Sequence, residues 1–84
     1  MKRVDEFYQR IGQRLKESRV AAGVSQLTAA YELRVTDRTI SKYENGRSGV
    51  PLKMFVSMCD MYQVSAADVL LMDDVEWAQR GDKK

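Results

Sequence analysis

The chain has 84 residues and contains no histidine, a single cysteine and a single proline. Without histidine, it cannot build a Ser-His-Asp or Cys-His triad or a His-ligated zinc site. Its one cysteine, Cys59, can form neither an internal disulfide nor a thiolate metal site, which favours a reducing compartment. We therefore expect no enzyme of the usual kinds, no catalytic residues, no metal and no cofactor.

Long apolar runs are also lacking. No stretch approaches the roughly 20 apolar residues that cross a membrane, and the N-terminus, MKRVDEFYQR, has no apolar signal-peptide core. These features predict a cytoplasmic protein with no membrane partner. The length predicts one domain with a small core.

Charge is unevenly distributed along the chain. Residues 1–50 hold ten Lys or Arg and six Asp or Glu, whereas residues 51–84 hold four and six, for a net charge of +2. The first half is therefore locally basic. Contact with phosphate requires such local positive charge and not a high total.

Two short helices joined by a tight turn are predicted near the middle of the chain. Ser25 and Thr36 are placed to cap helices over residues 26–33 and 37–45. Gly46 follows the second helix, where a left-handed residue commonly ends a helix.

The second of these helices has two unlike faces. At 100° per residue, Ile40 and Tyr43 share one face with Glu44 at its margin, and this face must be buried. A helix about 10–12 Å wide fits the major groove of B-DNA, where Arg and Lys can bind guanine O6 and N7. An ordinary amphipathic helix with a solvated polar face would show the same periodicity. The outer face carries Asp37, Arg38, Thr39, Ser41, Lys42 and Asn45.

The residues of this region, SQLTAAYELRVTDRTISKYENGR, resemble the helix-turn-helix of the Cro/phage-repressor family, also called the XRE family. The family pattern reads roughly SQxxLAxxLGVSxxTISxxENGR, and residues 11–71 can be laid on its five helices. The resemblance implies an all-α, five-helix lambda-repressor-like DNA-binding domain over residues 1–72, with the motif at about 25–45.

The chain departs from the family pattern at two places. Arg34 stands where the family usually has glycine, so the turn must tolerate a side chain. Ala29 stands where a core leucine is usual, and Leu27 lies at a normally polar site. The first motif helix is therefore either slightly rotated or leaves Leu27 exposed.

Site residues follow from the helix geometry and the resemblance together. Arg38, Ser41 and Lys42 are the predicted base contacts, and Gln26 and Arg47 the predicted phosphate contacts. The whole predicted DNA-binding set is Gln26, Thr36, Asp37, Arg38, Thr39, Ser41, Lys42, Asn45 and Arg47. Within it, Thr36 and Asp37 are favoured as helix caps, with contacts to DNA as their alternative.

A structural ion pair is also predicted. Phe7, Ile11 and Leu15 recur at every fourth residue of a first helix and define its buried stripe, on which Arg19 falls next. A buried arginine needs a partner, and the resemblance implies that this partner is Glu44. The alternative is that Arg19 bends to solvent.

The remaining helices are predicted over residues 5–22, over residues 52–62 and around residues 69–71. Residues 73–84 form an acidic tail with the only tryptophan, Trp77. This tail is expected to be disordered, to extend the fifth helix into a dimer or protein-partner contact, or to pack back on its own domain.

The leading hypothesis is a sequence-specific transcriptional regulator, most simply a repressor, that binds double-stranded DNA. A single motif reads few base pairs, so we expect a homodimer on a roughly palindromic operator. Such a protein would be bacterial or phage-encoded and associate with the nucleoid when bound. The alternative is a protein-interaction module or an antitoxin on the same scaffold.

Overall fold

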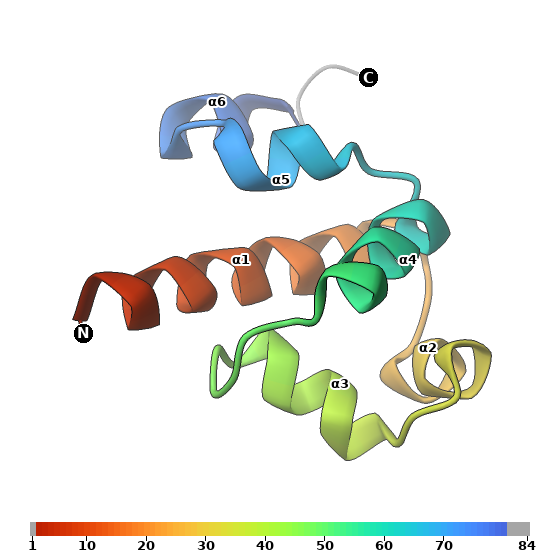
Figure 1. The fold of residues 1–84 in the computed structure, drawn as a ribbon. Helices are drawn as coiled ribbons and strands as arrows, with labels where there is room; N and C mark the ends of the chain where they lie inside the picture. The colour runs from red at the N-terminus through yellow and green to blue at the C-terminus, as the bar shows by residue number, and fades with distance from the viewer. Residues whose placement is uncertain (1, 81–84) are drawn as a thin grey trace.

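The computed structural model describes residues 2–80, and this part of the chain folds into six helices (Figure 1). In Figure 1, α1 crosses the middle of the molecule, with α5 and α6 on one side and α2 and α3 on the other. The all-α fold predicted from the sequence is confirmed, and a sixth short helix follows the expected five. The helices are α1 (Lys2–Ala21), α2 (Gln26–Leu33), α3 (Asp37–Glu44), α4 (Leu52–Tyr62), α5 (Ala66–Leu71) and α6 (Asp74–Arg80).

Local capping sets the limits of the two central helices. The Ser25 hydroxyl accepts a hydrogen bond from the Thr28 backbone N–H at 3.0 Å, and the Thr36 hydroxyl accepts one from the Thr39 N–H at 3.2 Å. Each bond satisfies an N–H that has no partner inside its helix. Gly46, at φ +68°, follows α3 in the predicted left-handed conformation.

The core gathers around α1. Residues from every helix contribute to it, and Leu15, Ile40 and Val69 are fully buried. Phe7, expected on the same buried stripe as Leu15, is instead 38 % exposed. That expectation was wrong because Phe7 lies one turn before Ile11, where the elements packed on α1 cover it only in part, so helical spacing alone does not ensure burial.

Leu27 and Ala29 show how α2 packs. Ala29 is fully buried, whereas Leu27 is 69 % exposed. α2 therefore turns its two alanines, Ala29 and Ala30, toward the core, and Leu27 is an exposed apolar side chain.

The turn between α2 and α3 tolerates a side chain in a left-handed conformation. Arg34 has φ 61° and ψ 41°, and its N–H closes the end of α2 on the carbonyls of Ala30 and Tyr31. Gln63 ends α4 in the same way, with φ 58°. Side chains other than glycine are strained in this region, so both turns store some conformational energy.

The tail packs back on its own domain. The extended conformation of Met72 separates α5 from α6, so α6 is not a continuation of α5. A reciprocal pair of bonds starts α6: the Asp73 carboxylate accepts from the Glu76 N–H at 2.8 Å, and the Glu76 carboxylate accepts from the Asp73 N–H at 3.1 Å. Trp77 is 8 % exposed. Residues 81–84 of the predicted tail lie outside the described residues.

No helix within residues 2–80 is both long and apolar enough to traverse a lipid bilayer.

Candidate nucleic-acid interface

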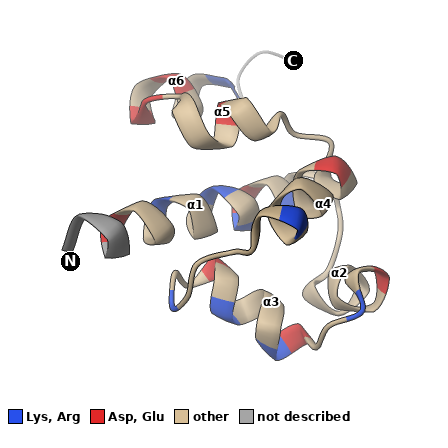
Figure 2. Cartoon of the chain, viewed as in Figure 1, with Lys and Arg blue, Asp and Glu red and all other residues tan. Residues whose placement is uncertain are grey.

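α3 buries one face and presents the other to solvent. Ile40, Tyr43 and Glu44 are buried, as the periodicity predicts, while Arg38 and Lys42 are exposed. Figure 2 shows basic positions along α3 and in the loop after it, and acidic positions on α6. Basic groups therefore lie on the exposed side of the motif helix.

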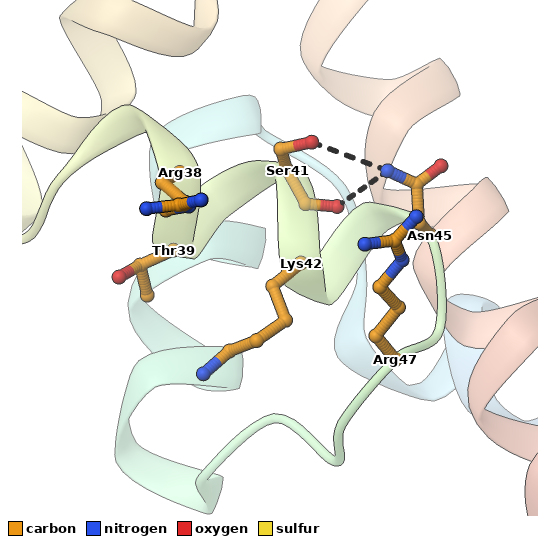
Figure 3. Close-up of a pocket in the computed structure, with 6 residues that line it drawn as sticks. All are labelled: Arg38, Thr39, Ser41, Lys42, Asn45 and Arg47. Atoms are coloured by element: carbon orange, nitrogen blue, oxygen red, sulfur yellow. Dashed lines mark hydrogen bonds between the residues drawn. The ribbon is translucent and has the colours of Figure 1, made fainter.

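The outer face of α3 and the following loop border a shallow hollow of about 320 Å³ (Figure 3). Arg47 reaches from the loop toward the α3 side chains, so the cationic groups of Arg38, Lys42 and Arg47 share one surface. In the side chains described from residue 6 to residue 80, no carboxylate is paired with any of these three cations. The hollow is lined by Arg38, Thr39, Ser41, Lys42, Asn45 and Arg47.

Two of the predicted contact residues are bonded to each other. The Asn45 amide donates to the Ser41 carbonyl at 2.9 Å and to the Ser41 hydroxyl at 3.1 Å. The Ser41 oxygen keeps its O–H for an acceptor on a base edge, and the Asn45 side-chain oxygen keeps its lone pairs for a donor. Their orientation is thus set before any ligand binds.

The start of α3 separates the roles of two polar neighbours. Thr36 caps the helix, and its hydroxyl also lies 3.0 Å from the Thr39 hydroxyl. Asp37 lies exposed in the first turn, where a negative charge suits the helix dipole. The expectation that Asp37 caps α3 was wrong, because the preceding residue makes the capping bond.

The predicted ion pair between Arg19 and Glu44 is present and buried. Arg19 Nε donates to Glu44 Oε2 at 2.7 Å, and Nη2 donates to Oε1 at 3.2 Å. The remaining Nη1 donates to the Val24 carbonyl at 2.8 Å. This bidentate pair joins α1 to the last residue of α3, so it fixes the angle at which α3 is presented.

Gln26 enters the same network. Its amide Nε2 donates to Glu44 Oε1 at 2.9 Å, which ties the first residue of α2 to the last residue of α3. Sequence reasoning placed Gln26 at a phosphate and did not foresee this bond. The bond uses one amide N–H, so the second amide N–H of Gln26 stays available to an anion, whereas the Thr28 backbone N–H of the same turn is already bonded to Ser25.

Burial perturbs two titratable groups near the network. It raises the pKa of the Tyr62 hydroxyl to about 12, with a further contribution from the nearby Glu44 carboxylate. Burial alone raises the pKa of the Cys59 thiol to about 11. Both groups are therefore protonated at neutral pH, and Cys59 is a small buried residue of the core.

Arg14 is a buried charged residue that sequence reasoning missed. It is 2 % exposed, and its guanidinium donates to the Val69 carbonyl at 2.9 Å and to Asp74 Oδ1 at 3.0 Å. It also lies 4.9 Å from the centroid of the Trp77 ring, while the Trp77 indole donates to Glu17 Oε1 at 2.7 Å. These contacts hold α5 and α6 against α1, away from α3.

No cluster of three or more potential metal ligands occurs among the described residues.

Three comparisons with known proteins bear on this geometry. A family model described as a helix-turn-helix domain matches residues 10–72. No curated protein matches the chain.

Among solved structures, two crystal structures of the clp gene regulator ClgR from Corynebacterium glutamicum are similar to this chain. One has a TM-score of 0.72 at 29 % identity and covers 93 % of this chain and 94 % of that one. The other has a TM-score of 0.75 at 27 % identity and covers 92 % of this chain and 82 % of that one.

Proposed function

Because the chain belongs to the helix-turn-helix domain family, we propose that it is a sequence-specific transcriptional regulator that binds double-stranded DNA. The likeness to a clp gene regulator supports this class of function. A domain bound over a promoter occupies DNA that RNA polymerase must contact, so repression is its simplest action. It would act on DNA in the bacterial cytoplasm.

The observation that carries the proposal is the exposed face of α3. Arg38 and Lys42 project from a helix whose other face is anchored by Ile40 and Tyr43. Such a helix fits the major groove, where a guanidinium or ammonium group can donate to guanine O6 and N7. No described carboxylate is paired with Arg38 or Lys42. These cations can therefore bind DNA without first breaking an ion pair within the protein.

The other predicted contacts have separate tasks in this proposal. Gln26 and Arg47 flank α3 and would bind phosphate oxygens, which fixes the register of the protein without reading sequence. Ser41 and Asn45, already bonded to each other, present one donor and one acceptor to base edges. Asp37 lies where it can accept from a cytosine N4 amine.

We further propose that two copies bind a roughly palindromic operator. One α3 helix reads only a few base pairs, and two-fold related copies would read half-sites one DNA turn apart, about 34 Å. The 36 × 32 × 18 Å extents of the molecule are compatible with neighbouring copies at this spacing.

Binding across a salt series tests the proposal. A duplex selected from a random pool should bind with an affinity that falls by about 0.9 log units per log unit of salt for each phosphate contacted. Arg38→Ala and Lys42→Ala should each cost about 1–3 kcal/mol on this duplex and relax specificity. Lys16→Ala, which removes an exposed cation of α1 outside the hollow, is the matched control. Undetectable or salt-independent binding would contradict the proposal.

A protein-interaction module or an antitoxin is the second candidate. The observation in its favour is an apolar pair on α2, Leu27 and Tyr31, which are 69 % and 81 % exposed and one helical turn apart. If the salt series detects no DNA binding while Leu27→Gln and Tyr31→Gln reduce association with a purified protein partner, this second function replaces the first.

A further inference from the structure

We propose that Thr39 selects a thymine in the DNA, through contact between its side-chain methyl group and the C5-methyl group of that base. This inference rests on the function proposed above and names one base that the DNA-facing hollow would recognise. Thr39 is partly exposed in the first turn of α3 and lines the hollow. Among the six residues that line it, Thr39 is the only one that bears a methyl group.

The hydroxyl group of Thr39 is held by the residue that caps α3. Thr39 Oγ1 lies 3.0 Å from Thr36 Oγ1, and the same Thr36 oxygen accepts a hydrogen bond from the Thr39 backbone N–H at 3.2 Å. The hydroxyl and the methyl group of a threonine share one Cβ atom, and rotation about the Cα–Cβ bond is restricted to staggered positions. A bond that holds the hydroxyl therefore also fixes the direction of the methyl group before DNA binds.

Thr39 lies at the end of the hollow where α3 begins. Figure 3 shows it beside Arg38, with Asn45 and Arg47 at the opposite end. In helix-turn-helix proteins, the N-terminal residues of the helix in the major groove contact base edges. The Thr39 methyl group is therefore in the part of the hollow that would lie nearest to the bases, whereas Arg47 lies toward the loop.

A methyl group on this surface favours thymine over the other three bases. Thymine alone presents a methyl group in the major groove, whereas guanine, adenine and cytosine present only hydrogen-bonding groups. Arg38 and Lys42 carry donors, which suit guanine O6 and N7 and gain little from a methyl group. Contact between two methyl groups removes both from water, and burial of one such group changes an equilibrium constant about three- to tenfold. We expect a preference for thymine of this size.

Replacement of thymidine by 2′-deoxyuridine in the duplex selected by wild type tests this contact. Deoxyuridine lacks only the C5-methyl group and keeps the O4 acceptor and the base pairing. The replacements are made one position at a time, and the affinity is measured for each duplex. At one position of each half-site, the change should lower the wild-type affinity about three- to tenfold.

Two variants of Thr39 separate the methyl group from the hydroxyl group. Thr39→Ser removes the methyl group and should bind the thymine and uracil duplexes equally. Thr39→Val keeps a methyl group and should retain the wild-type preference for thymine. The capping bond uses the backbone N–H of residue 39, so both variants should fold, which helical circular dichroism would verify. Lys16→Ala, which removes an exposed cation outside the hollow, is the control and should keep both the affinity and the preference.

The possible outcomes separate this inference from the proposed function. If Arg38→Ala weakens binding but no deoxyuridine position matters, or if Thr39→Ser keeps the thymine preference, the inference is overturned and the proposed function stands. Loss of the preference in Thr39→Val would assign the recognition to the hydroxyl group and would also overturn the inference. If wild type binds no duplex, the proposed function and this inference fail together.

Discussion

Gly12 of α1 lies against the main chain of Tyr43 in α3, with no room for a side chain between them. A β-carbon at Gly12 would collide with the Tyr43 carbonyl oxygen and would lie 2.8 Å from the carbonyl oxygen of Glu44. The position of α3 therefore depends on a glycine in the middle of a long helix, where glycine is otherwise unfavourable.

Gly12→Ala tests this close approach. Alanine has the higher helix propensity, by about 1 kcal/mol, yet the added carbon must push α3 away. We expect a net loss of about 1–3 kcal/mol in the free energy of unfolding, measured by urea denaturation. Gln13→Ala, at the exposed neighbouring position, should change it by no more than about 0.5 kcal/mol. Equal effects of the two substitutions would show that the contact is unimportant.

Arg19→Met should be more damaging than its position on α1 suggests. It removes two of the three described donors to the Glu44 carboxylate and leaves that charge buried with Gln26 alone. Breaking a buried pair in this way costs about 3–5 kcal/mol. The stability against urea and the affinity for DNA should both decrease. Lys16→Met, which removes an exposed cation of the same helix, should change neither quantity. An unchanged melting curve and unchanged affinity would argue against the pair as a positioning element.

Arg34→Gly is expected to stabilise the protein. The left-handed conformation of Arg34 costs a side-chain-bearing residue about 1 kcal/mol, and glycine relieves that cost. Arg34→Ala keeps the strain and removes only the guanidinium, so it separates the backbone effect from the loss of charge. A rise in melting temperature for glycine but not for alanine is the expected result, and equal responses would refute the strain argument.

Cys59 should act as a reporter of global unfolding. Its thiol is buried and its pKa is raised to about 11 from an ordinary value of 9.0. At pH 8, a thiol reagent should therefore modify the chain only when urea unfolds it. Rapid modification of the folded chain would contradict the burial of Cys59.

The same pKa shift predicts a loss of stability in alkali. Between pH 9 and 11 the unfolded chain releases the Cys59 proton while the folded chain keeps it, so stability falls as pH rises. Above pH 10, Tyr62 adds to this loss for the same reason. The urea midpoint should decrease between pH 8.5 and 10.5, and Cys59→Ala should reduce the decrease.

The central helices could be predicted closely because their limits depend on local chemistry. Ser25, Thr36 and Gly46 act within four residues of themselves, so a linear sequence contains most of the information that places them. The start of α6 depends on local chemistry in the same way, so the sequence also contains a signal for it. Asp73 and Glu76 have the spacing of a capping box, although their acidity alone suggests a tail.

Features that depend on the meeting of distant segments could not be predicted in the same way. The burial of Arg14 requires the Val69 carbonyl and Asp74, which lie 55 and 60 residues away in the chain. Phe7 satisfies the helical pattern of a core residue, yet the described segments cover it only in part and leave it 38 % exposed. The Gln26 bond to Glu44 likewise arises only when α2 crosses the end of α3.

Selection of bound duplexes from a random pool, performed in parallel with wild type, Arg38→Ala, Lys42→Ala and Lys16→Ala, tests the central claim most directly. If the exposed face of α3 reads the major groove, wild type and Lys16→Ala enrich the same two-fold symmetric sequence. Arg38→Ala and Lys42→Ala would each lose base preference at their own position in both half-sites, by about 1–3 kcal/mol. Four identical enriched sequences, or no enrichment by any of the four proteins, would contradict the account.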